Sequence, residues 1–212
     1  MRLTGHKIAI LLESDFYEPE ILYYQHRFPE EGAEVHFLSR MWGQDEITFQ
    51  GHEHRMPFVV RESFEDIDEF ALKEFSAVIV PSGMVSDRLR YTEDPAELPP
   101  AARFLRRAFQ DPAIVKGIIC HGMWLTAPVP HLVRGRRAVV HNNLLGDLRN
   151  MGGLYVDEDV VVDEDLVTAR TGAHCHLFAR TIIDLIALRD RDRERAARAR
   201  GVTRAAALGG AR

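Results

Sequence analysis

Short apolar segments alternate with segments of helical character along most of this chain, and this alternation constrains the fold more than any other feature. Four apolar segments have the length of one strand each: residues 6–12, 33–39, 75–80 and 115–119. Helical patterns occupy residues 18–31, 98–110 and 178–188. Strands that are continuously apolar are typical of a parallel sheet that is buried on both faces. The alternation therefore predicts an α/β fold, a three-layer sandwich whose mostly parallel sheet carries helices on both faces.

The remaining segments predict smaller elements around this sheet. Further strands are expected at residues 137–141 and 166–169, and a hairpin at residues 155–162. Residues 41–60 are polar, with turn points at Gly43 and Gly51, and predict a small hairpin or loop insertion outside the core. We therefore expect one α/β domain over residues 1–188, followed by an Arg-rich tail over residues 189–212.

Composition narrows the classes of function. The chain of 212 residues has a net charge of −5, although its tail holds eight Arg against three acids. The interleaved acids and the lack of aromatic residues favour a solvated helical or flexible tail over a nucleic-acid-binding segment. No apolar run has the length of a membrane span, and Cys120 and Cys175 are the only cysteines. We expect a cytoplasmic protein with reduced thiols, no nucleic-acid partner and no membrane association.

The segment from Val115 to Leu125 contains the main candidate for catalysis. An apolar strand leads to Cys120, and His121-Gly122 then turn the chain into a second apolar run. This is the pattern of a nucleophile elbow, in which one strained residue stands between a strand and a helix. A thiol at that point lies over helix N-terminal amides, which favour the thiolate. The alternative is an inert cysteine buried in the core.

Several side chains are candidates to activate this thiol. His121 follows it directly, Glu18 comes after the first predicted strand, and His141 ends a later one. A carboxyl group near the sulfur can donate a hydrogen bond to the thiolate or orient a histidine. Simpler alternatives stay open, since Glu18 also suits a helix N-terminus and His141 a solvent-facing strand end. Residues 13–15 and 81–83 also follow strands, so they should meet Cys120 at one edge of the sheet.

Neither a metal site nor a cofactor is expected. The run His174-Cys175-His176 is too tight for a usual zinc site, because neighbouring side chains point in different directions. No second pair of ligands lies at a suitable spacing, and His52 and His54 of the insertion are expected to face solvent. The chain has neither a phosphate-binding glycine loop nor the G-x-S-x-G motif of serine hydrolases.

Together these residues resemble the ThiJ/PfpI family, from about residue 7 to about residue 188. The matching segments are Lys7–Leu12 with Glu18, Val80-Pro81-Ser82-Gly83, Asp87-Arg88-Leu89-Arg90, Ile119-Cys120-His121-Gly122, Tyr155-Val156-Asp157-Glu158 and Leu166–Thr171. The family includes intracellular cysteine peptidases, glyoxalases that act without glutathione, and stress proteins. The resemblance implies a flavodoxin-like, class I glutamine amidotransferase-like fold.

The resemblance also implies a role for each candidate residue. Cys120 would be the nucleophile, Glu18 would form a hydrogen bond with its sulfur, and His121 would be the partner base. Backbone amides of Gly83 and His121 would form the oxyanion hole. His141 corresponds to a histidine that lines the pocket in the stress-protein branch.

The chain differs from the family pattern around the pocket. Ser82 replaces a usual glycine, and Trp124 would narrow the pocket unless it points into the core. Cys175 is a conceivable resolving thiol, although a plain pocket or core residue is the simpler alternative. Asp87, shorter than the usual glutamate, stands where peptidase-like members place a carboxylate that reaches the histidine of a neighbouring subunit. Gly122 belongs to the pocket as part of the elbow.

These features predict a cysteine-dependent enzyme that acts on a small-molecule substrate with a carbonyl- or amide-like group. Glyoxalase- or deglycase-like conversion fits, and so does hydrolysis or hydration. We expect a homodimer or a larger homo-oligomer. An intracellular peptidase is the narrower version of this function, and it needs such an oligomer because Asp87 would act in trans. The alternative from another class is a redox-sensing or chaperone stress protein, because an exposed reactive thiol oxidises readily.

Overall fold

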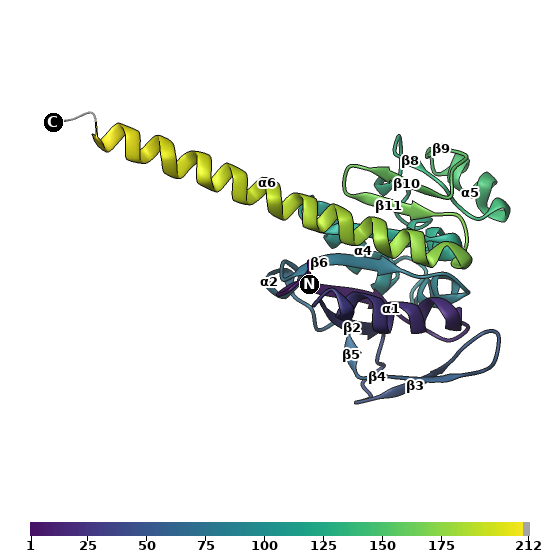
Figure 1. Ribbon diagram of the computed structural model, residues 1–212. Coiled ribbons are helices and arrows are strands. Elements are labelled where there is room, and N and C mark those ends of the chain that lie inside the picture. Colours follow the sequence, from purple (N-terminus) through teal and green to yellow (C-terminus); the bar gives the residue numbers. More distant parts are fainter. Residues whose placement is uncertain (210–212) are drawn as a thin grey trace.

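A seven-stranded sheet forms the centre of the part of the chain that the structure describes (Figure 1). The computed structural model describes the backbone of residues 1–209 and the side chains of residues 1–199. The strand order is β10-β11-β7-β6-β1-β2-β5, and every pair is parallel except β10 with β11. The strands of this sheet are β1 (Lys7–Leu11), β2 (Glu34–Ser39), β5 (Glu62–Ser63), β6 (Phe75–Val80), β7 (Val115–Ile119), β10 (Val160–Asp163) and β11 (Leu166–Ala169). The predicted mostly parallel α/β sheet is confirmed.

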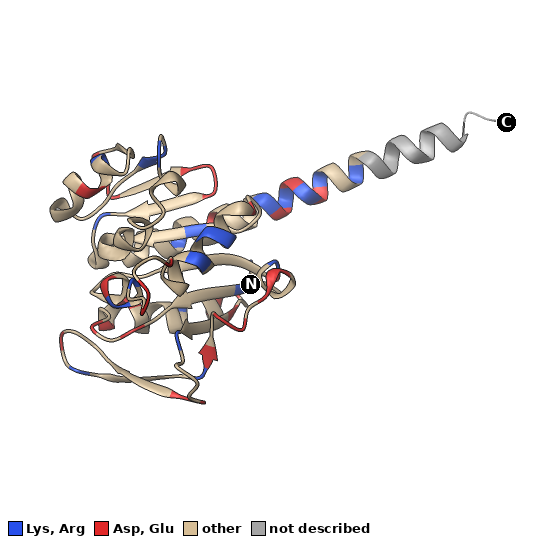
Figure 2. Cartoon of the chain, turned by 180° about the vertical axis from the view of Figure 1, so that it is seen from behind, with Lys and Arg blue, Asp and Glu red and all other residues tan. Residues whose placement is uncertain are grey.

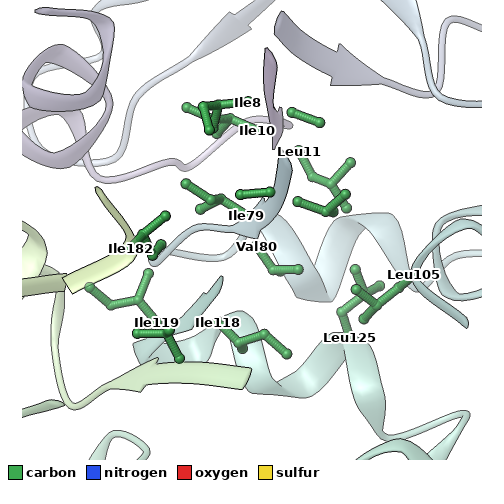
Figure 3. Close-up of a cluster of buried hydrophobic side chains, with 14 of the residues drawn as sticks. Ile8, Ile10, Leu11, Ile79, Val80, Leu105, Ile118, Ile119, Leu125 and Ile182 are labelled. Carbon is green, nitrogen blue, oxygen red and sulfur yellow. The ribbon is translucent and has the colours of Figure 1, made fainter. Parts of the chain in front are cut away.

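Helices cover both faces of this sheet, as predicted. Helices α1 (Glu18–Glu30) and α6 (Cys175–Gly209) pack together on one face, and α3 (Val85–Leu89) and α4 (Pro100–Gln110) contact each other on the opposite face. Figure 3 shows the resulting core, with Ile182 of α6 on one side of the strands and Leu105 of α4 on the other. Successive residues of β7 point to opposite faces, so Ile118 and Ile119 contribute to different layers. The remaining helices are α2 (Glu69–Leu72), α5 (Leu145–Asn150) and the short 3₁₀ turns η1 (Cys120–Thr126), η2 (Pro130–Leu132), η3 (Asn142–Leu144) and η4 (Gly172–His174).

Two of the smaller elements differ from the sequence prediction. The strand expected at residues 137–141 is only β8 (Arg137–Ala138), and it pairs with β9 (Leu154–Tyr155) outside the central sheet. The hairpin expected at residues 155–162 is wrong, because β10 instead pairs antiparallel with β11. The turn between these strands contains Glu164 at a φ of 58°, a left-handed conformation that closes a tight hairpin there.

The segment at residues 41–60 forms an antiparallel pair of its own, β3 (Ile47–Gln50) with β4 (Pro57–Val60). This hairpin is tied to the loop after β1 by backbone hydrogen bonds. The Asp15 N–H donates to the Gln50 carbonyl at 2.7 Å, and the His52 N–H donates to the Phe16 carbonyl at 2.8 Å. The turn of the hairpin is therefore held at the carboxyl end of β1.

Helix α6 continues from the core into the Arg-rich tail, and Figure 2 shows basic and acidic residues alternating along the described part of this helix where it leaves the body of the protein. Exposed ion pairs one turn apart join Arg193 to Asp190 and Arg198 to Glu194. Such pairs stabilise a solvated helix by a few tenths of a kcal/mol each. Residues 210–212, the last of the predicted tail, lie outside the described residues. Within the described chain, no helix combines the length and apolarity that crossing a membrane requires.

A buried ion pair lies at the edge of the sheet opposite the carboxyl ends of its strands. Lys116, near the start of β7, has a fully buried side chain that donates to the Asp165 carboxylate and to the Asp111 carbonyl. Arg136 also donates to Asp165, at 2.8 Å. Burial lowers the pKa of Lys116, and its carboxylate partner opposes this shift. This cluster ties β7 to the turn before β11.

Asp165→Asn should therefore destabilise the fold, because it leaves the Lys116 ammonium buried without its anionic partner. We expect a loss of about 3 kcal/mol in the free energy of unfolding, measured by urea denaturation. Asp45→Asn, at an exposed loop position, is the control and should change that free energy little. Equal stability of the Asp165 variant and the wild type would contradict a stabilising role for this pair.

Candidate active site

Cys120 stands where β7 ends and η1 begins, at a backbone φ of 57°. A positive φ is rare for a residue with a side chain and marks local strain. The next turn is fastened to α3, because the Ser86 hydroxyl donates to the Gly122 carbonyl at 2.9 Å. The strand, the strained cysteine and the helical turn together have the geometry of a nucleophile elbow.

His121 lies beside this thiol. Its Nδ1 is 3.2 Å from the Cys120 Sγ, and its ring lies 4.7 Å, centroid to centroid, from that of His141. Burial and the neighbouring His141 lower the pKa of His121, so the imidazole is neutral near pH 7. The ring therefore has a free nitrogen to accept a proton.

Trp124 does not narrow the site. The Trp124 ring packs edge-on against the His121 ring, with 5.0 Å between the two centroids. The guanidinium of Arg90, the residue that follows α3, lies 5.4 Å from the centroid of the Trp124 ring. Trp124 is half-buried, and it packs against His121 without lining the cavity.

The expectation that the elbow favours the thiolate is not met in the resting protein. Burial raises the pKa of the Cys120 thiol to about 11, although the His121 and Gly172 N–H groups donate to the sulfur and lower it. Desolvation outweighs these two donors, so the resting group is a neutral thiol beside a neutral imidazole. The thiol must then lose its proton when it reacts, and His121 is the base in contact with it.

Glu18 does not occupy the place that the sequence suggested. Its buried carboxylate accepts hydrogen bonds from the N–H groups of Glu53 at 2.8 Å and of His54 at 2.7 Å. These donors lower the pKa of Glu18 against the effect of its burial. Because both oxygens are bound in the turn between β3 and β4, the expected hydrogen bond to the Cys120 sulfur is wrong.

Glu20 of α1, rather than Glu18, is the glutamate whose charge acts on the Cys120 thiol. It is fully buried, accepts from the Ser82 N–H at 3.0 Å and binds the Ser82 hydroxyl. Burial raises the pKa of Glu20 to about 7, and its charge acts on both Cys120 and Cys175. Glu20 was not identified from the sequence. The available signal was its position one helical turn before Tyr24, which places both residues on the buried side of α1.

These groups face a cavity of about 400 Å³ at the carboxyl ends of β1, β6 and β7. The sequence candidates on its walls are Ser82, Gly83, Cys120, His121 and His141, and the further lining residues are Tyr17, His52, Glu53, Met84, Thr171, Gly172 and Ala173. Gly83 adopts a φ of 81°, and a Cβ there would lie 2.3 Å from the Asp15 carbonyl oxygen, so this wall requires glycine. His52 is exposed to solvent, as expected, and it also lines the cavity.

The remaining candidates lie around this cavity. Asp87 is half-exposed on α3 and binds Arg90 at 2.9 Å. Cys175 is a buried free thiol at the start of α6, and burial raises its pKa to about 11.

The histidines on either side of Cys175 point in different directions. His174 contacts the Thr171 hydroxyl, and His176 contacts the Ala173 carbonyl. Among the described side chains, no three potential ligands gather as a metal site.

Glu20 and Glu18 should affect the pKa of the Cys120 thiol differently. Glu20→Gln removes a negative charge that raises the Cys120 pKa, so we expect the pH midpoint of Cys120 alkylation by iodoacetamide to fall. Glu18→Gln is the matched comparison, two residues away on the same helix, and should shift that midpoint much less, since its carboxylate binds the turn between β3 and β4 rather than the residues beside the thiol. A midpoint that responds to Glu18 and not to Glu20 would contradict this placement.

The chain is similar to known proteins over most of its length. The model of the DJ-1/PfpI family matches residues 6–185. A deglycase of Pyrococcus horikoshii is 29% identical over 180 residues, which cover 85% of this chain and 99% of the relative. Protein/nucleic acid deglycase 2 of Escherichia coli is 30% identical over 183 residues, with 85% and 97% covered. The structure of Schizosaccharomyces pombe DJ-1 has the same fold, with a TM-score of 0.72 at 17% identity over 85% of this chain and 91% of that one. The chain belongs to the DJ-1/PfpI family.

Proposed function

We propose that this protein is a cysteine-dependent enzyme in which the Cys120 thiol adds to the carbonyl carbon of a small 2-oxoaldehyde or of a related adduct. The observation that carries the proposal is the thiol at a strained elbow, 3.2 Å from a neutral imidazole, in the wall of an open cavity. Its relatives named as deglycases support a substrate with a carbonyl-derived group. The volume of the cavity suits a small molecule.

In the first step, the sulfur forms a bond to the aldehyde carbon while the thiol proton passes to His121. The carbonyl oxygen becomes an oxyanion, and the backbone N–H groups of Gly83 and His121 are the proposed donors to it. His121 then returns the thiol proton to the oxyanion, which gives a neutral hemithioacetal and leaves the imidazole able to act as a base again. Next, His121 moves a proton from the former aldehyde carbon to the neighbouring carbon, while the hydroxyl proton passes to the oxygen on that neighbouring carbon. These transfers convert the hemithioacetal into the thioester of a 2-hydroxy acid. Water hydrolyses the thioester, releasing a 2-hydroxy acid and the free thiol.

Two other functions are less well supported by the site. Peptidase action would need Asp87 to reach His121 of a second copy in a homodimer or larger oligomer, and Asp87 binds Arg90 here. A sensor of oxidants would benefit from a low thiol pKa, whereas burial raises that of Cys120. The proposed carbonyl chemistry, with His121 as the base, needs neither a second subunit nor a low pKa of the thiol.

Cys120→Ser tests the nucleophile. We expect the conversion of methylglyoxal to lactate to fall by at least about a hundredfold, because a serine hydroxyl beside a neutral imidazole is a far weaker nucleophile. Cys175→Ser, which changes the other buried thiol, is the comparison variant and should retain far more activity. Equal turnover by the wild type and the Cys120 variant would refute the proposal.

The pH dependence tests His121 as the base. Since the pKa of His121 is lowered, its basic form predominates at neutral pH and is lost as the pH falls through that lowered value. We expect kcat/KM to be level near pH 7 and to decline below about pH 6.5, the ordinary histidine value. A decline that begins well above pH 7 on acidification would contradict a neutral resting imidazole.

A further inference from the structure

The turn between β3 and β4 is held against the active site by a buried carboxylate. Glu18 is 2% exposed, and its two oxygens accept the N–H groups of Glu53 and His54. Gly51 lies so close that a Cβ there would be 2.2 Å from the Glu18 Oε1, which leaves no room for a side chain. Hydrogen bonds to a carboxylate are about twice as strong as those between neutral groups. Glu18 thus fixes the path of the turn.

This turn brings Glu53 to the mouth of the cavity. Glu53 and His52 both line the cavity, and both side chains are exposed to solvent. Among the described side chains, the Glu53 carboxylate makes no hydrogen bond or ion pair. It is the only acidic residue among those that line the cavity.

Two arginines beside the turn are already paired with carboxylates. Arg55, in the same turn, binds Asp15 at 3.0 Å, and Arg88 of α3 also binds Asp15. Arg88 lies 3.7 Å from Glu13 as well, so two arginines face two carboxylates in this cluster. Neither arginine lines the cavity. Glu53 therefore leaves an uncompensated negative charge at the mouth.

We propose that the β3–β4 turn determines charge specificity: Glu18 positions it, and Glu53 selects substrates that carry a positive group beside the reacting carbonyl. This inference rests on the proposed carbonyl chemistry for its substrate, but the charge of the mouth is independent of turnover. An ammonium or guanidinium group on the substrate would meet the Glu53 carboxylate while the carbonyl lies at Cys120. An anionic substituent would be repelled at the same place.

Labelling of Cys120 by charged thiol reagents tests the charge without requiring catalysis. The probes are two methanethiosulfonates of similar size, one with a trimethylammonium group and one with a sulfonate, and peptide mass analysis assigns the label to Cys120. Glu53→Gln should lower the ratio of the cationic to the anionic labelling rate about fivefold, the size expected for one partly solvated charge. Added salt should shrink the wild-type ratio.

Glu69→Gln is the matched control, because α2 precedes β6 and so lies at the sheet edge away from the cavity. It removes the same charge from the protein as a whole and should leave the labelling ratio unchanged. An equal ratio in the wild type and the Glu53 variant, or an equal loss in the Glu69 variant, would overturn the proposal.

Turnover gives a second test that separates failure of the specificity from failure of the proposed function. Phenylglyoxals with a trimethylammonium, a carboxylate or no charged substituent form the substrate series. Glu53→Gln should lower kcat/KM for the cationic substrate relative to the neutral one, mainly through KM. No turnover of any member would refute the carbonyl chemistry, while the labelling ratio would still decide the charge of the mouth.

Glu18 is a positioning residue in this proposal, and amide hydrogen exchange tests it directly. Glu18→Gln should speed exchange of the Glu53 and His54 N–H groups about tenfold, because a charged acceptor is lost. The Ser82 N–H, which Glu20 binds, is the internal control and should keep its rate. The same variant should lower the labelling ratio in the direction of Glu53→Gln; unchanged exchange at both amides would refute the positioning role.

Discussion

The parallel pairing of β1, β6 and β7 is the constraint on which the rest of this structure depends. Parallel strands end at one edge of the sheet, so the loops after them meet although they are far apart in the chain. The register pairs Ile10 with Ile79 and Ile79 with Gly117, which aligns the ends of the three strands. The elbow at Cys120, the wall at Gly83 and the start of α1 are therefore neighbours. The contacts among the loops that follow these three strands depend on that alignment.

Two glutamates at the start of α1 show how helix geometry divides roles within a short segment. Residues two apart on a helix point about 200° apart around its axis. Glu20 accordingly binds Ser82, and its charge acts on the two thiols, whereas Glu18 binds the β3–β4 turn. One carboxyl group contributes to the electrostatics of the thiol, and the other holds a wall of the cavity. The same helix thus links the centre of the site to its mouth.

Much of the fold could be predicted because it depends on local patterns. Apolar runs such as residues 75–80 became strands of the central sheet, and the helix over residues 18–31 ends within a residue of its predicted boundary. The prediction of a hairpin at residues 155–162 was wrong because the tertiary structure determines which strands pair, and β10 pairs with β11 rather than with β9. Short strands carry too little local information to specify their partners.

The sequence by itself determined the alternation of strands and helices and the elbow at Cys120, because both depend on neighbouring residues and their periodicity. Only the tertiary structure decided which carboxyl group approaches the thiol, since Glu20 binds Ser82 across a separation of 62 residues. It also decided the protonation of the site, because burial outweighs the amide donors and keeps Cys120 neutral at rest. Desolvation and long-range contacts depend on the whole fold, and no local pattern in the chain encodes them.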